Sequence, residues 1–195
     1  MYQIYKDARD KSWEVLINCN IDTLPVNLML IAQHYKIKIV KYSESKYIQR
    51  LNIPDTDGFS VYRKLLKQHI IYYNDKVENK ARIRFTIAHE LGHCLLGHNL
   101  NTHTNYRNSE VDDKSKPDET AANIFARDIL MPATVLHGLD VSSAKEIAKI
   151  CSVSKQSAEI RFNRLLELNK RGMYNKHPLE RQVYNQFKDY VEKFK

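Results

Sequence analysis

Apolar residues recur at every third or fourth position in some stretches of the chain and at every second position in others. The first spacing predicts a helix over residues 25–35, with Pro25 at its start and an apolar face of Leu28, Ile31, Ala32 and Tyr35. The second spacing predicts strands over residues 36–42, 59–63 and 69–74. The last of these strands leads into Asn74 and Asp75, which are typical turn residues.

Helical patterns dominate the rest of the chain. They predict one helix over residues 81–98, which ends near Gly97, and a second over residues 117–131, which ends before Pro132. Two short helices are predicted around residues 144–169, and a last one begins at about Leu179. The polar stretch at residues 99–116 predicts a loop. A few strands combined with separate helices indicate the α+β class.

Cysteine usage and hydrophobicity limit the compartments in which this chain is expected. Its three cysteines, Cys19, Cys94 and Cys151, are odd in number and far apart, which argues against a disulfide framework and favours a reducing compartment. The N-terminus lacks the apolar segment of a signal peptide, and no run approaches the roughly 20 apolar residues that span a bilayer. We therefore expect a cytoplasmic protein without a membrane partner.

The net charge of +8 is unevenly distributed. Residues 141–195 carry 12 Lys and Arg against 6 Asp and Glu, so this segment alone has a net charge of +6. A basic segment can contact nucleic acid or an acidic protein. A solvated surface of amphipathic helices is an equally good interpretation.

His89, Glu90 and His93 form the pattern H-E-x-x-H within a predicted helix. Residues four apart lie on one helical face, so both imidazoles can bind a single metal ion. Glu90 is one position away and can act as a base on a water molecule whose pKa zinc lowers toward about 7. Chance gives this pattern about 0.02 times in a chain with this many His and Glu residues. The alternative, two surface histidines beside a salt-bridging glutamate, requires that coincidence.

A catalytic zinc ion usually has three protein ligands and one water, so a third ligand is needed. The metzincin pattern would require Gly and His where this chain has Leu96 and Asn99. We favour Glu119, in the first turn of the next long helix, although an acid there also stabilises a helix N-terminus. Asn123, on the same face, could fix a ligand histidine by a hydrogen bond. The rival carboxylates are Glu110, Asp112, Asp113 and Asp118.

Two residues near the motif need an interpretation of their own. His98 lies five residues after His93, about 140° round an ideal helix. We interpret it as a helix-end residue and a candidate contact to substrate or metal. Cys94 points off the metal face and is expected to pack in the core.

Two blocks of the sequence resemble the ImmA/IrrE family of bacterial and phage metallopeptidases. They are RFTIAHELGH at residues 84–93 and ETAANIFARDILMP at residues 119–132. The resemblance implies a zinc site with Glu90 as general base and with the ligands His89, His93 and Glu119. The family more often has a further glutamate where this chain has Ala121, a difference that leaves the ligand set intact.

The resemblance also implies a fold and a substrate. Family members have a zincin-like fold, in which a small mixed sheet packs on the H-E-x-x-H helix. This would place a metallopeptidase domain at residues 1–138 and a helical segment at residues 139–195. Members are cytoplasmic and typically cleave a helix-turn-helix repressor of a prophage, a mobile element or a stress regulon.

Residues 144–168 are typical of a helix-turn-helix, with Ser154 as the cap of the second helix. Val153 is expected in the turn, and inward positions are expected at Ile147, Ala148, Ile150, Ile160, Leu165 and Leu166. Exposed positions that could meet phosphates or base edges are Lys155, Gln156, Arg161 and Arg164. Plain structural helices are the stronger alternative, because related peptidases often carry such a segment.

The sequence leaves three functions open. The first is a zinc endopeptidase that cleaves a regulatory protein, with residues 69–74 as an edge strand for substrate and an oxyanion donor among Tyr106, His103 and Arg127. The second is a zinc-stabilised regulator that binds DNA or a repressor without proteolysis. The third is a partner in a toxin–antitoxin pair. Manganese and cobalt can occupy similar nitrogen and oxygen sites, so the metal itself is not fixed.

Overall fold

The computed structural model of the chain describes residues 2–50, 56–100 and 116–194. The helices in these ranges are α1 (Tyr2–Asn18), α2 (Leu28–His34), α3 (Lys46–Arg50), α4 (Lys80–Leu95), α5 (Lys116–Leu130), α6 (Ala133–Gly138), α7 (Ala144–Cys151), α8 (Lys155–Arg171), α9 (Pro178–Gln186) and α10 (Lys188–Phe194). The strands are β1 (Lys38–Lys41), β2 (Gly58–Arg63) and β3 (Gln68–Tyr73), and the short 3-10 helices are η1 (Tyr42–Glu44) and η2 (Lys64–Leu66). No helix in this part of the chain is long and apolar enough to cross a bilayer.

The described strands form a mixed sheet in the order β1-β3-β2. β1 runs parallel to β3, with Ile39 opposite Ile71, and β2 runs antiparallel to β3, with Ser60 opposite Ile71. This sheet and the helices confirm the α+β class. β3 is central, so the expectation that residues 69–74 form an edge was wrong. Both sides of β3 are already hydrogen-bonded, and an added strand would have to pair with β1 or β2.

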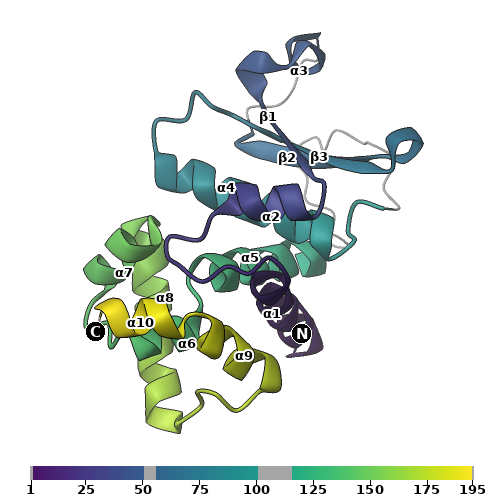
Figure 1. The fold of residues 1–195 in the computed structure, drawn as a ribbon. Coiled ribbons are helices and arrows are strands. Elements are labelled where there is room, and N and C mark those ends of the chain that lie inside the picture. The colour runs from purple at the N-terminus through teal and green to yellow at the C-terminus, as the bar shows by residue number, and fades with distance from the viewer. Residues whose placement is uncertain (1, 51–55, 101–115, 195) are drawn as a thin grey trace.

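The sheet lies at one end of the molecule, with α4 beneath it and α5 beneath α4 (Figure 1). α4 packs against β2 and β3 on one face of the sheet. The other face carries a small apolar cluster of Val61, Ile70 and Tyr72, which Ile48 of α3 covers. α5 packs on α4, and α1 packs on α5. This layering holds α4 between the sheet and α5, and so fixes the direction in which the motif faces.

α4 and α5 approach each other closely where Gly92 faces Ala122. A Cβ atom on Gly92 would lie 3.1 Å from Cδ1 of Phe125 and 3.2 Å from Cα of Ala122, which is tighter than ordinary packing. Ala122 and Phe125 are themselves fully buried. Glycine at this position therefore allows the first turn of α5 to lie next to the motif.

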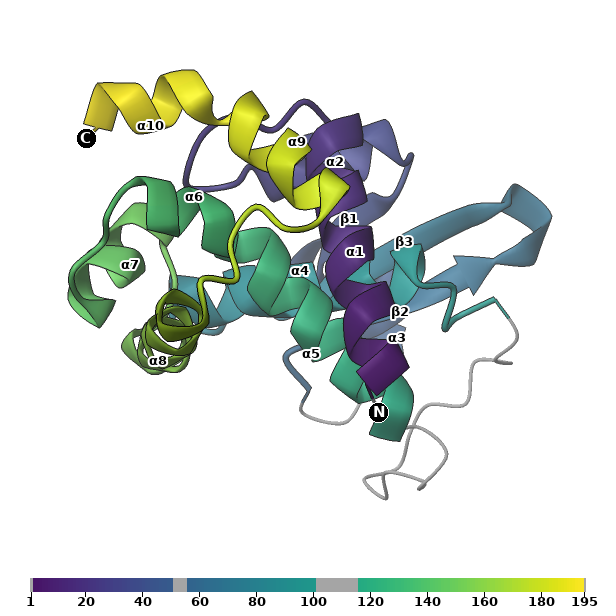
Figure 2. The ribbon, with the colours of Figure 1, turned by 90° about the horizontal axis from the view of Figure 1, so that it is seen from below.

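One apolar core continues from the N-terminal helices into the C-terminal ones. Its members include Leu16 of α1, Leu91 of α4, Ile129 of α5, Ile147 of α7 and Phe187 after α9. Figure 2 shows α9 lying against α1, and the two helices are in contact. Residues 139–195 thus share a core with the rest of the chain, while a domain boundary at residue 138 stays a prediction.

Several elements differ from those expected. α2 begins at Leu28 rather than at Pro25, because the side chain of Asn27 caps it by accepting hydrogen bonds from the N–H groups of Met29 and Leu30. The last expected helix is divided into α9 and α10 at Phe187. α1, α3 and α6 are additional helices that were not among the expected elements.

α7 and α8 are joined by a short turn, and Ser154 caps α8 by accepting a hydrogen bond from the N–H of Ser157. The buried face of α8 consists of Ala158, Arg161 and Leu165. Ile160 and Leu166 lie off this face and are 58% and 43% exposed, so their expected place in the core was wrong.

Candidate metal centre

α4 presents His89 and His93 on adjacent turns, and α5 presents Glu119 in its first turn. The Nε2 atoms of the two histidines are 3.0 Å apart. The Glu119 carboxylate closes the triangle, with Oε2 3.3 Å from Nε2 of His89 and Oε1 3.4 Å from Nε2 of His93. Each of the three side chains thus directs one nitrogen or oxygen atom toward a common point.

The spacing of these atoms suits a tetrahedral metal ion. An ion bound at about 2.0–2.1 Å holds its ligand atoms about 3.3 Å apart. The two Nε2 atoms are 3.0 Å apart, and they lie 3.3 Å and 3.4 Å from different oxygens of Glu119, so that one ligand atom from each residue lies within 4.8 Å of the others. Two imidazole nitrogens and one carboxylate oxygen are a donor set found in catalytic zinc sites. Among the residues that the structure describes, no other group of three His, Cys, Asp or Glu side chains is close enough to hold an ion. The residues present therefore fit zinc.

Electrostatics at this site favour an ionised carboxylate. Hydrogen bonds from His89 and His93 hold the pKa of Glu119 well below its usual range, although partial burial acts in the opposite direction. Burial would lower the pKa of His89, but its hydrogen bond to Glu119 and the charge of Glu90 outweigh burial and raise that pKa. Glu119 therefore offers a charged oxygen to a cation at neutral pH.

Asn123 fixes the ring of His89. Its Oδ1 lies 3.0 Å from Nδ1 of His89. When Asn123 accepts a hydrogen bond from that Nδ1–H, the lone pair of Nε2 is left for the shared point. Asn123 is four residues after Glu119 on α5, so the same helical face supplies the carboxylate and the amide.

His98 lies beside the His93 ring, on the side opposite to His89 and Glu119. The Nδ1 atoms of the two rings are 3.0 Å apart, and Nε2 of His98 is 3.7 Å from Oδ1 of Asp118. His98 therefore touches the nitrogen of His93 that faces away from Glu119, and it is not placed to ligate the same ion. The expected position about 140° round the helix from His93 was wrong, because α4 ends at Leu95 and the chain turns back.

Glu90 is 8% exposed and is held by a residue of the sheet. The Oγ of Ser60, on β2, donates to Oε2 of Glu90 at 2.6 Å, and Nδ2 of Asn99 donates to Oγ of Ser60 at 2.6 Å. The sequence reasoning assigned a role to neither Ser60 nor Asn99. Ser60 precedes Glu90 by 30 residues and comes close to it only through packing of the sheet on α4.

Of the rival carboxylates, only Asp118 is among the described residues, and Cys94 beside His93 packs in the core as expected. Cys94 is buried, and burial raises the pKa of its thiol to about 12, so it is not a thiolate at neutral pH. Asp118 faces His98 rather than the shared point. The remaining candidates from the sequence lie outside the described residues: His103, Tyr106, Glu110, Asp112 and Asp113.

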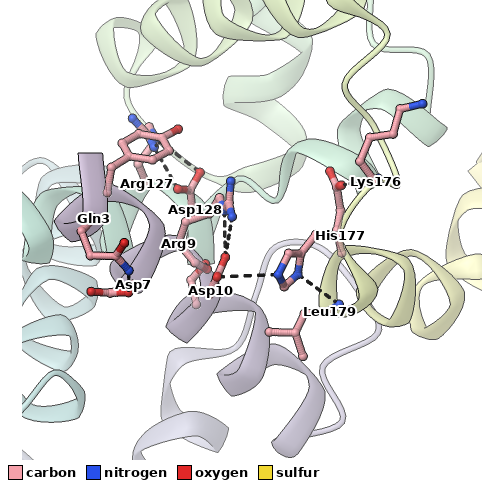
Figure 3. Close-up of polar contacts among 12 residues, drawn as sticks. Gln3, Asp7, Arg9, Asp10, Arg127, Asp128, Lys176, His177 and Leu179 are labelled. Atoms are coloured by element: carbon pink, nitrogen blue, oxygen red, sulfur yellow. Dashed lines mark hydrogen bonds and ion pairs between the residues drawn. The ribbon is translucent and has the colours of Figure 1, made fainter. Parts of the chain in front are cut away.

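Arg127 does not reach the metal centre, contrary to the expectation that it could donate to the oxyanion. It lies eight residues after Glu119, about 12 Å along the helix. Its Nη2 donates to the hydroxyl of Tyr5 at 3.1 Å and to Oδ2 of Asp128 at 2.8 Å, and the guanidinium lies over the Tyr5 ring. Figure 3 shows Arg127 beside Asp128. These contacts bind Arg127 to α1 and to its own helix.

Arg161 was expected to be an exposed residue that could contact DNA, and this expectation was wrong. It is 2% exposed, and its Nη1 lies 2.8 Å from Oδ1 of Asp128. The residue lies on the inward face of α8 and joins that helix to α5. Lys155 and Gln156 are exposed and Arg164 is partly exposed, so their contact with nucleic acid stays a prediction.

Comparison with known proteins finds similarity to metallopeptidases. Residues 32–163, which are more than half of the chain, match the peptidase family described as the IrrE N-terminal-like domain. A stretch of 92 residues is 30% identical to Metallopeptidase ImmA of Bacillus subtilis (strain 168), and it covers 47% of this chain and 51% of that protein. The alignment therefore spans about half the length of this curated relative.

Proposed function

This chain belongs to the ImmA/IrrE family of metallopeptidases, and on that premise we propose that it is a zinc-dependent endopeptidase. The observation that carries the proposal is the convergence of His89, His93 and Glu119 next to the buried carboxylate of Glu90. Two imidazoles and one carboxylate leave one position of a tetrahedral ion open, as hydrolysis requires.

In the proposed mechanism the protein positions the reactants and moves one proton. Bound zinc would polarise the scissile carbonyl and acidify a water molecule. Glu90 takes the proton of the attacking water and passes it to the leaving amine. The Ser60 hydroxyl, which donates to Oε2 of Glu90 at 2.6 Å, keeps this carboxylate in place.

The proposed substrate is a regulatory protein of the helix-turn-helix repressor type, encoded by a prophage or mobile element. Support comes from the two sequence blocks that resemble the ImmA/IrrE family. β2 is an outer strand among the described strands, and its Ser60 touches Glu90, so an extended peptide added along β2 would pass beside the site. The three free cysteines support a cytoplasmic location.

The test is co-expression of this chain with the repressor encoded by a neighbouring gene, with Glu90→Gln as the variant. The wild-type chain should cleave the repressor, and the variant should lose at least about 100-fold in rate, because a general base contributes roughly 10²–10⁴-fold. Bound zinc, measured on the purified proteins by elemental analysis, should remain, because Glu90 is not one of the converging ligands.

Glu78→Gln is the matched control, since it makes the same chemical change at an exposed glutamate that precedes α4. It should leave both cleavage and zinc content unchanged. If Glu90→Gln cleaves the repressor as fast as the control does, Glu90 is not the base and the proposed mechanism is wrong.

A further inference from the structure

The end of α4 has the geometry of a Schellman motif. The helix is capped at Leu96, Gly97 adopts a left-handed φ of +80°, and two backbone hydrogen bonds close the turn. The N–H of Gly97 donates to the carbonyl of Cys94 at 3.4 Å, and the N–H of His98 donates to the carbonyl of His93 at 3.1 Å. In this motif the residue after the glycine packs on the residue five positions earlier. That pair is here His98 and His93.

The pair that usually makes an apolar contact is thus a pair of imidazoles. Both side chains are well shielded from solvent, at 13% exposed for His98 and 9% for His93. Their Nδ1 atoms are 3.0 Å apart, which is hydrogen-bonding distance. One of the two nitrogens must therefore carry a proton and the other must accept it.

The proton assignment follows from the role of His93. Its Nε2 faces His89 and Glu119, and a metal ligand needs a free lone pair on that nitrogen. When Nε2 of His93 binds the ion instead of donating to Glu119, a neutral His93 carries its proton on Nδ1 and donates it to Nδ1 of His98. A neutral His98 carries its own proton on Nε2, which faces Oδ1 of Asp118 at 3.7 Å. This arrangement of protons satisfies the hydrogen bond between the two histidines and directs the Nε2–H of His98 toward Asp118, which lies beyond hydrogen-bonding distance.

We propose that His98, backed by Asp118, is a positioning residue that fixes the tautomer and the ring orientation of the ligand His93. This rests on the proposed function, because it assumes that His93 binds zinc. Asn123 does the same for His89 through an amide oxygen. The two ligand histidines are thus held by two different groups: an amide oxygen from α5 holds His89, and an imidazole nitrogen from the turn that ends α4 holds His93.

The test measures zinc affinity of the full-length chain by competition with a chromophoric chelator. His98→Leu keeps the apolar packing of the turn but removes the acceptor, and it should weaken zinc binding about 10–100-fold. His98→Gln restores a carbonyl acceptor and should recover most of that loss. Asp118→Asn should have a smaller effect, because it acts on His98 rather than on the ligand.

Two further measurements separate positioning from plain packing. Circular dichroism and urea unfolding of the metal-free variants show whether each is folded before its affinity is compared. Two-dimensional NMR of the ¹⁵N-labelled imidazoles reports the tautomer directly: His93 should be protonated at Nδ1 in the wild type and should lose that preference in His98→Leu. His34→Leu, at an exposed histidine of α2, is the control and should change neither readout.

The outcomes distinguish this inference from the function on which it rests. If the wild-type chain binds no zinc, the proposed function fails and this inference fails with it. If the wild type binds zinc and both His98→Leu and His98→Gln bind it equally well, His98 is a packing residue and only this inference is overturned. Equal loss in both variants also overturns it, because the glutamine oxygen should substitute for Nδ1.

Discussion

Two of the carboxylates on helix α5, Glu119 and Asp128, are paired with basic side chains of opposite character. Glu119, in its first turn, faces the imidazoles of His89 and His93, and its side chain is 34% exposed. Asp128, near its last turn, faces the guanidinium groups of Arg127 and Arg161, and its side chain is 5% exposed. One cluster is open to solvent and ligands, and the other is sealed inside the protein.

A charged cluster is available for metal binding only when its basic partners can give up their protons. Guanidinium groups are permanently protonated, so Asp128 is neutralised by partners that never give up their protons. Burial would raise the pKa of Asp128, but Arg161 and Arg127 outweigh burial and lower it. Neutral imidazoles, by contrast, have lone pairs to offer. Glu119 and its partners His89 and His93 can therefore bind a metal ion together, whereas Asp128 joins α5 to α8 through its ion pair with Arg161.

The largest effect is expected in the sealed cluster. Asp128→Asn leaves Arg161 buried without its counter-charge, and breaking a buried pair costs about 3–5 kcal/mol in the free energy of unfolding. Urea unfolding of the metal-free chain measures this loss. Zinc affinity of the folded protein should stay the same, because Asp128 is about 13 Å along the helix from Glu119.

Asp128→Leu combined with Arg161→Met is the matched control. This double variant removes both charges together and should regain much of the lost stability. A loss below about 1 kcal/mol in Asp128→Asn would contradict the view that this pair holds α8 on α5.

Glu119→Gln should lower zinc affinity strongly and change the stability of the metal-free chain little, which is the reverse of Asp128→Asn. Zinc affinity is expected to fall at least about 100-fold, or about 2.7 kcal/mol, since an amide is a poor replacement for a charged ligand oxygen. The free energy of unfolding of the metal-free chain should change by no more than about 1 kcal/mol, because the carboxylate is a third exposed. Chelator competition and urea unfolding measure the two quantities. Equal zinc affinity in variant and wild type would remove Glu119 from the ligand set.

A smaller effect should appear when stability is followed with pH. The lowered pKa of Asp128 means that its stabilising contribution is present above the unfolded pKa of about 3.9 and is lost as pH falls through the folded pKa. The stability gap between wild type and Asp128→Asn should therefore narrow below about pH 4, by up to about 1.4 kcal/mol per pH unit. Urea midpoints at pH 7 and at pH 3, with chelator present, provide the comparison. A gap that does not change with pH would mean that Asp128 is not the titrating group.

The sequence predicts the parts of this molecule that depend on local spacing. The strands β1, β2 and β3 and the helices α4 and α5 follow from alternation and from helical periodicity. The spacing of His89 and His93 places both on one face of α4 for the same reason. α1 was missed although its buried positions, Ala8, Ser12, Val15 and Leu16, have helical spacing.

The parts that were not predicted depend on contacts between distant segments. Arg161 is buried because Asp128 of α5 meets α8, and nothing within residues 144–168 indicates that partner. Ser60 reaches Glu90 only because β2 packs on α4. His98 was placed by extending an ideal helix past its end, although Gly97 before it is the usual sign of a helix stop.

The close contact at Gly92 means that helix packing, rather than loop closure, sets the distances among the three donor atoms. The site is therefore pre-organised: an incoming ion finds the donors already spaced and does not have to order the chain. Zinc fingers differ, because they have too little core to fold without metal. For the proposed zinc enzyme we expect that withdrawal of the ion stops turnover while the fold persists, and that resupply restores activity at the speed of ion delivery rather than of refolding.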